Sequence, residues 1–169
     1  TFSLPFAILI LLFPKKIMLI FGSQFLQGYP ILMILVSAAF IQAVFGIGGT
    51  TLNMTGFPKM NLLNTFIACG LNIGLNFYLI PTMGGMGAAT ATLITLSFIA
   101  FIRIIQNWKL LQLTPWSPKL VKPIIAGILA FGTGYLVKGS IMPFHTIITL
   151  MSSGFIIVIV FFTTLWLLG

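Results

Sequence analysis

Four asparagines in the apolar segment 61–80 carry the side chains best suited to bind a polar ligand. They are Asn61, Asn64, Asn72 and Asn76. At 100° per residue they fall within about a 120° arc of a helix. Such an amide face could line a cavity and bind sugar hydroxyls or phosphate, so Asn64, Asn72 and Asn76 are candidates for substrate contact. The alternative is that Asn72 and Asn76 hydrogen-bond to neighbouring helices, at ~1 kcal/mol each, and we favour it.

Arg103 is the candidate for a phosphate contact. An arginine binds phosphate through a bidentate fork, and a lysine binds it as a point charge. Arg103 and the lysines could therefore hold the diphosphate of a lipid-linked substrate. The same charges would also anchor the chain to ordinary anionic headgroups, at ~1 kcal/mol per basic residue, and we favour this anchoring role.

Side chains that the sequence lacks limit the mechanism further. The chain has eight Lys and Arg, one His, one Cys and no Asp or Glu. It therefore has no acid–base pair, no Ser-His-Asp triad, no metal-binding cluster and no carboxylate for coupling transport to protons or sodium. We expect a protein that is not an enzyme and that binds no metal or cofactor. The basic residues are scattered between apolar runs, so the net charge of +8 does not indicate nucleic-acid binding.

Small residues mark two further helix faces. Gly70 and Gly74 lie on roughly the opposite side of segment 61–80 from the asparagines. Gly84, Ala88 and Ala91 share one stripe at the start of the next apolar segment. Small residues at this spacing let helix backbones approach closely, which predicts packing. A glycine-rich helix start can also bind an anion. This one lacks the lysine and the Ser/Thr that complete a phosphate-binding loop motif, so we favour packing.

The elements that position these residues are membrane-spanning helices. The chain is 59% hydrophobic and only 5% charged, with a mean hydropathy of +1.20. A soluble domain carries about 25% charged residues. Since a span needs about 20 apolar residues, about six spans fit and indicate an all-α integral membrane protein. Their predicted limits are residues 1–21, 29–54, 61–80, 85–105, 121–137 and 145–168.

Loop charges predict the orientation of these spans. Lys59 follows the second span, and four basic residues lie between residues 103 and 122, whereas the hairpin 81–85 has none. Positive loops face the cytoplasm, which places both chain ends there. Lys15 and Lys16 argue the other way, although long side chains can reach an interface. We expect a four-span unit at residues 1–105, a cytoplasmic interfacial linker at 106–120 and a terminal helix pair at 121–169.

The run of residues 52–92 resembles the C-terminal half of the polysaccharide biosynthesis flippases, the O-antigen and capsule repeat-unit exporters of the multidrug/oligosaccharidyl-lipid/polysaccharide superfamily. The resemblance extends over about residues 1–113. The matching positions form a turn, a helix end and a small-residue helix start: Leu52, Gly56, Pro58, Lys59, then Leu75, Asn76, Leu79, Ile80, Pro81, then Gly84, Gly87, Ala88, Ala89, Ala91, Thr92.

This resemblance implies a transporter of twelve to fourteen helices in two lobes, with the present chain forming most of the C-terminal lobe. It implies alternating access and a lipid-linked oligosaccharide, carried on undecaprenyl diphosphate, that moves from the cytoplasmic to the outer leaflet of the plasma (inner) membrane for surface polysaccharide such as the O-antigen of lipopolysaccharide. We expect a fragment of a longer protein whose partners are membrane lipids, this substrate and the missing N-terminal lobe.

Three other functions remain open at this point. A multidrug or cation antiporter of the same superfamily would need a buried carboxylate, which this chain cannot supply. A non-transporting membrane assembly subunit would also use small-residue stripes. A membrane-embedded glycosyltransferase would need acid–base residues, which are absent here.

Overall fold

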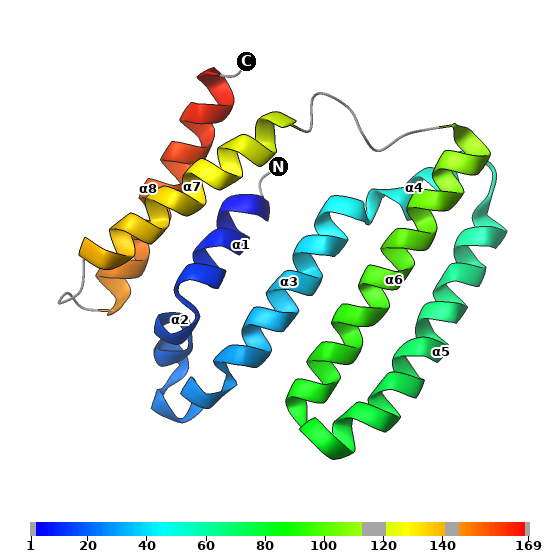
Figure 1. Cartoon of the computed structure of the whole chain (residues 1–169), viewed down its shortest axis with the longest axis horizontal. Helices are drawn as coiled ribbons and strands as arrows, with labels where there is room; N and C mark the ends of the chain where they lie inside the picture. Colours follow the sequence, from blue (N-terminus) through cyan, green and yellow to red (C-terminus); the bar gives the residue numbers. More distant parts are fainter. Residues whose placement is uncertain (1–2, 113–120, 141–145, 168–169) are drawn as a thin grey trace. The chain divides into compact units, whose positions relative to one another are not determined.

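The computed structural model is built from helices and describes residues 3–112, 121–140 and 146–167. No β-strand occurs among these residues. In chain order the elements are α1 (Ser3–Leu12), α2 (Pro14–Phe21), the 3₁₀ helix η1 (Ser23–Gly28), α3 (Tyr29–Phe45), α4 (Ile47–Met54), α5 (Pro58–Met83), α6 (Gly85–Leu111), α7 (Val121–Ser140) and α8 (Thr146–Leu167), as drawn in Figure 1. The prediction of an all-α protein is confirmed for the described part of the chain.

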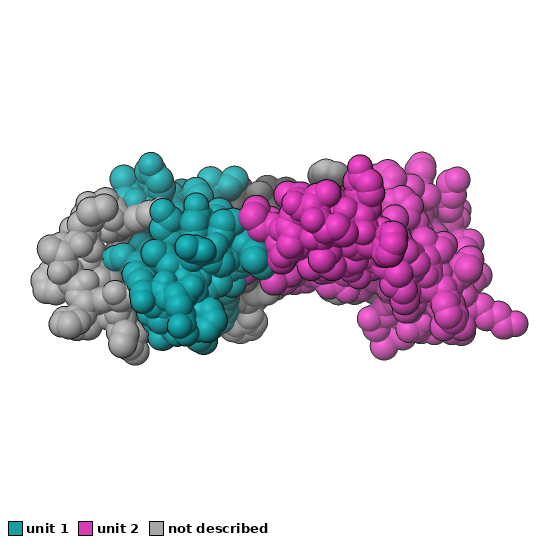
Figure 2. Space-filling model, turned by 90° about the horizontal axis from the view of Figure 1, so that it is seen from below, with its two compact units in different colours: residues 1–33, 116–169 teal, residues 34–115 magenta. Residues whose placement is uncertain are grey.

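The chain divides into two compact units, coloured separately in Figure 2. Unit 1 takes residues 1–33 and 116–169, and unit 2 takes residues 34–115. In unit 1, α1 packs against α7 and α8. The core of that unit is apolar and tightly filled: Ile8, Leu12, Phe13, Ala126, Ala130, Ile157 and Phe161 are all buried.

Unit 1 also contains a sharp break in the predicted first span. The axes of α1 and α2 differ by 82°. Pro14 starts α2 and cannot donate a backbone hydrogen bond to the turn before it. The preceding Phe13 has φ −122° and ψ 41°, outside the helical region, as expected for a residue before proline. The segment 1–21 is therefore not one straight helix.

Unit 2 is organised around the antiparallel helices α5 and α6, which lie side by side in Figure 1. A single residue, Gly84, separates them and has φ +56°. The turn is tight because Gly87 has no side chain: a Cβ there would overlap the Leu79 carbonyl of α5. The short helix α4 packs against both α5 and α6 at the other end of the pair.

The structure contains fewer complete spans than the predicted six. Three stretches of the described chain are long and apolar enough to cross a membrane, namely Ser23–Met54, Pro58–Met83 and Gly85–Leu111. A fourth is obtained if the bent pair Leu4–Leu12 and Pro14–Phe21 forms one span. The last two predicted spans correspond to α7 and α8, in which the apolar stretches Ala126–Leu136 and Ser152–Thr164 are shorter.

The predicted linker 106–120 begins inside a helix, because α6 continues to Leu111 and ends at Gln112 in a left-handed conformation with φ +51°. A positive φ of this kind is a common helix ending. The remainder of that linker, residues 113–120, lies outside the described residues.

Candidate functional site

A group of polar side chains lies where α4, α5 and α6 meet in unit 2. We call it the Arg103 cluster. It comprises Gly48, Gly49 and Asn53 of α4, Asn61 and Asn64 of α5, and Arg103, Gln106 and Asn107 of α6. Polar groups are costly inside a membrane unless they find partners, so a cluster that joins three apolar helices is a candidate functional site.

Arg103 is partly buried at the centre of this cluster. Its Nη2 donates a hydrogen bond of 3.2 Å to the Asn61 Oδ1 atom. The Asn61 amide nitrogen in turn donates to the Asn53 Oδ1 atom at 3.1 Å. The Arg103 Nε atom is buried and has no hydrogen-bond partner among the described residues. The guanidinium therefore retains a donor for a further acceptor.

The charge of Arg103 has no acidic partner within the chain. The sequence contains no Asp or Glu, so no side-chain carboxylate of these 169 residues can neutralise it. The group that it contacts, Asn61, is neutral. A partly buried guanidinium in this situation favours an anion that can accept hydrogen bonds from its fork, such as a phosphate oxygen.

Asn64 and Gln106 form a reciprocal pair of amides between α5 and α6. The Asn64 Nδ2 atom donates to Gln106 Oε1 at 2.6 Å, and the Gln106 Nε2 atom donates to Asn64 Oδ1 at 3.0 Å. Asn64 is only 1% exposed. Because both of its amide atoms are engaged with Gln106, Asn64 holds two helices together in this structure.

The glycines of α4 allow its backbone to approach α6 closely. The Asn107 Nδ2 atom donates to the Gly48 carbonyl at 3.2 Å, while its buried Oδ1 has no hydrogen-bond partner among the described residues. A Cβ at Gly49 would lie 2.9 Å from the Arg103 Cζ atom and 3.0 Å from Asn61 Oδ1. Gly49 is therefore part of what determines the position of the guanidinium.

Asn72 and Asn76 belong to a separate polar pair further along α5. The Asn72 Nδ2 atom donates to the Thr95 hydroxyl of α6 at 3.4 Å. The Asn76 Nδ2 atom donates to Asn72 Oδ1 at 2.8 Å, and Asn76 Oδ1 is buried without a partner in the described structure. Thr95 follows Ala91 by four residues and so lies on the same side of α6 as the small-residue stripe. The asparagine face of α5 is thus directed toward that stripe.

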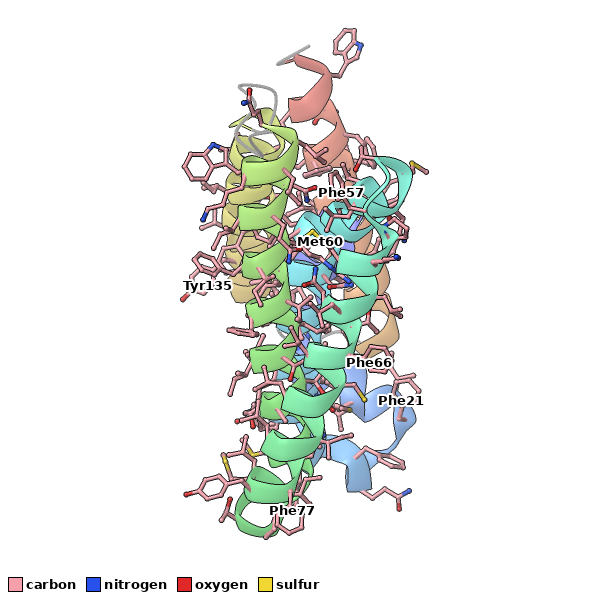
Figure 3. The ribbon with its side chains drawn as sticks, turned by 90° about the vertical axis from the view of Figure 1, so that its right-hand side faces the viewer. Phe21, Phe57, Met60, Phe66, Phe77 and Tyr135 are labelled. Atoms are coloured by element: carbon pink, nitrogen blue, oxygen red, sulfur yellow. The ribbon has the colours of Figure 1, made fainter. Side chains whose placement is uncertain are left out.

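The small residues named from the sequence differ in their surroundings. Ala91 is fully buried, and Ala88 is partly buried. Apart from neighbours on the same helix, no described residue comes within 4 Å of where a Cβ would lie at Gly70, Gly74 or Gly84. On α5, Phe66 and Phe77 are also exposed, by 68% and 85%, and Figure 3 shows Phe66 extending outward. The close approach between α5 and α6 instead depends on Gly87.

Sequence reasoning did not identify Asn53, Gln106, Asn107, Gly48 or Gly49 as parts of the site. One signal was available for the α6 residues, because positions 103, 106 and 107 have the i, i+3, i+4 spacing of a single helix face. Asn61 and Asn64 have the same i, i+3 spacing. The contribution of α4 had no comparable signal, since it depends on how that short helix packs.

Comparisons with known proteins find distant relatives only. No protein-family model matches the chain, and no solved structure matches it. An uncharacterized membrane protein of Methanocaldococcus jannaschii is 33% identical over 129 residues, which cover 73% of this chain and 25% of that protein. A probable low-salt glycan biosynthesis flippase of Haloferax volcanii is 38% identical over 84 residues, or 49% of this chain and 18% of that protein.

These matches, together with the long apolar helices, support a multi-pass membrane location. They also support, coarsely, the resemblance to membrane flippases. The chain spans a quarter or less of the length of these two relatives.

Proposed function

We propose that this chain is part of a flippase that moves lipid-linked oligosaccharide repeat units from the cytoplasmic to the outer leaflet of the plasma membrane, for surface polysaccharide synthesis. The observation that carries the proposal is the 38% identity over 84 residues to a protein named as a glycan biosynthesis flippase. The residues 52–92 that resemble the polysaccharide exporters point to the same activity.

In this proposal the helices of the chain form most of the C-terminal lobe of a two-lobe transporter with twelve to fourteen helices. The length of the relatives supports a larger assembly, because the matched segments are only 25% and 18% of those proteins. The ends of α5 and α6 that carry Lys59, Arg103 and Lys109 face the cytoplasm in this proposal, as their positive charges favour.

The Arg103 cluster is the proposed contact for the diphosphate of the substrate. The sequence offers its guanidinium no acidic side chain, and its Nε donor has no partner among the residues that the structure describes. Asn61 accepts a hydrogen bond from Nη2 and so helps to orient the guanidinium. Asn64 supports the site by tying α5 to α6, and the Asn72–Asn76 pair is the proposed polar contact nearer the Gly84 turn.

Transport in this scheme requires no bond to be made or broken in the substrate. It is a shift of populations between inward-open and outward-open states, which the substrate biases by binding them with different affinity. The chain itself has no carboxylate that could couple this shift to a proton or sodium gradient.

The test is genetic complementation. The complete gene that encodes this chain is expressed in a strain that lacks its own repeat-unit flippase, and surface polysaccharide is measured. Restored surface polysaccharide is the expected result. Export of cationic drugs without restored polysaccharide would favour an antiporter and overturn the proposal, and so would a complete lack of rescue by a protein that is expressed and inserted.

Arg103 variants sharpen this test. Charge-assisted hydrogen bonds are worth about 1.5–3 kcal/mol, so Arg103→Gln should weaken substrate binding by about 10- to 100-fold. Arg103→Lys keeps the charge but loses the fork, and should restore only part of the rescue. Lys109→Gln is the matched control, because Lys109 is exposed on the same helix. Equal rescue by all three variants would remove Arg103 from the proposed site.

A further inference from the structure

The bend after α1 creates a short surface element that transport does not explain. We call α2 and η1 together the elbow, which runs from Pro14 to Gly28. α1 is held in the core of unit 1 through Ile8 and Leu12. α2 turns by 82° from α1 and has no buried residue. It touches the core only from the side, through the partly buried Ile17 and its contact with α8.

Most of the elbow surface is apolar and uncovered within the described structure. Leu19 is 42% exposed, Ile20 54%, Phe21 69% and Phe25 51%. Figure 3 shows Phe21 extending outward. Between these residues the elbow has the uncharged polar side chains Ser23 and Gln24, both exposed. Exposed apolar groups beside polar ones are typical of a helix that lies at a membrane surface.

Two lysines occupy the first turn of α2: Lys15 is exposed and Lys16 is partly buried. Lys15 lies on the same side of the helix as Leu19, and Lys16 on the same side as Ile20, because the members of each pair are four residues apart. The Lys15 Nζ atom lies 5.0 Å from the centroid of the Tyr29 ring, and the Lys16 Nζ atom lies 5.8 Å from that of Phe13. These rings hold the ammonium groups at the elbow by cation–π contact. Tyr29 is also of the residue type that gathers at membrane interfaces.

The direction of α2 fits the same location. α1 packs with α7 and α8, helices of 20 and 22 residues whose apolar stretches, Ala126–Leu136 and Ser152–Thr164, are shorter than a complete span. With α1 along the membrane normal, a helix at 82° to it lies nearly parallel to the membrane plane. Its exposed leucine, isoleucine and phenylalanines can then enter the acyl-chain boundary, while the lysine side chains reach the headgroups.

From these contacts we infer that the elbow lies in the membrane interface and binds the phosphate headgroups of anionic phospholipids through Lys15 and Lys16. Charge complementarity selects this occupant, because the chain has no acidic residue that could pair with either lysine. The inference does not depend on the proposed transport activity.

The first experiment measures lipid selectivity. The full chain is placed in nanodiscs of phosphatidylcholine with a minor share of phosphatidylglycerol, and spin-labelled versions of the two lipids report which one is retained at the protein. Each lysine near an anionic surface contributes about 5-fold, so Lys15→Gln with Lys16→Gln should lower the preference for phosphatidylglycerol by up to about 30-fold. Lys59→Gln with Lys109→Gln is the matched control, because it removes the same charge from exposed positions of unit 2. Ordinary headgroup anchoring at those positions should cost a smaller part of the preference than the loss of the elbow lysines.

The second experiment measures depth and leaves the lysines intact. Cys69 is replaced by serine, and a spin label is attached at Ile20→Cys or at Phe25→Cys. A label at the interface should be accessible to oxygen and only weakly accessible to a water-soluble nickel complex. The lysine variants are also compared with the parent chain by circular dichroism, so that loss of fold is recognised.

Two results would overturn the inference. One is an unchanged phosphatidylglycerol preference in the folded lysine variant, or an equal loss in the control variant. The other is a label that neither reagent reaches, which would mean that a protein segment covers the elbow. Rescue of surface polysaccharide is a separate measurement, so this inference can fail while the proposed function stands.

Discussion

The Asn64–Gln106 amide pair offers the sharpest test of the structure, because it joins α5 and α6 through two hydrogen bonds. Asn64→Leu or Gln106→Met alone leaves a buried amide without its partner, which costs about 1–3 kcal/mol. The double variant removes both amides and should cost less than the sum of the single variants. Interhelical hydrogen bonds in membrane proteins average about 0.6 kcal/mol each, so two bonds predict a coupling of about 1.2 kcal/mol.

The assay is reversible unfolding of the full chain in mixed micelles of a mild detergent and sodium dodecyl sulfate, followed by circular dichroism. Asn64→Leu combined with Ser97→Ala is the control pair. Ser97 donates to the Leu93 carbonyl of its own helix and lies nine residues before Gln106, about 13 Å along α6. The control should be additive to within about 0.5 kcal/mol. A coupling for Asn64 and Gln106 no larger than that of the control would show that the pair does not form.

Two glycine substitutions test the close approaches in unit 2. Gly87→Ala should destabilise the chain by about 1–3 kcal/mol in the same unfolding assay, because its methyl group would overlap the Leu79 carbonyl. Gly70→Ala, whose Cβ would meet no described residue within 4 Å, should instead be neutral or stabilise α5 by up to ~1 kcal/mol. Equal losses for the two variants would contradict the tight turn. Gly49→Ala should reduce rescue in the complementation assay as Arg103→Gln does, because the new methyl group displaces the guanidinium; full rescue would mean that its position is unimportant.

Hydropathy predicted the later helices well and the first span poorly. The segments 61–80 and 85–105 fall inside α5 and α6, and the segment 29–54 falls inside the apolar stretch Ser23–Met54. The first predicted span failed because a sum of hydropathies is insensitive to backbone geometry. Pro14 interrupts the hydrogen bonds of the helix without making the segment less apolar.

For the candidate site, helical periodicity placed the asparagines on one face of α5, and the structure agrees in turning Asn64 and Asn72 toward α6. It also placed Gly70 and Gly74 on the opposite side, where they meet no described residue. Periodicity could not indicate that Asn61 meets Arg103, since these residues are 42 positions apart in the chain.

Composition and the spacing of apolar residues were enough to indicate a helical membrane protein, because this depends only on which side chains are present and how often they recur. The pairing of Arg103 with Asn61, the reciprocal amides of Asn64 and Gln106, and the contribution of α4 depend instead on the packing of three helices. Gly84 allows α5 and α6 to turn back on each other, and the missing side chains of Gly87 and Gly49 allow the backbones to come close. Such contacts depend on the volumes of the side chains and on the directions in which the helices pack. A linear pattern of residue types does not contain that information.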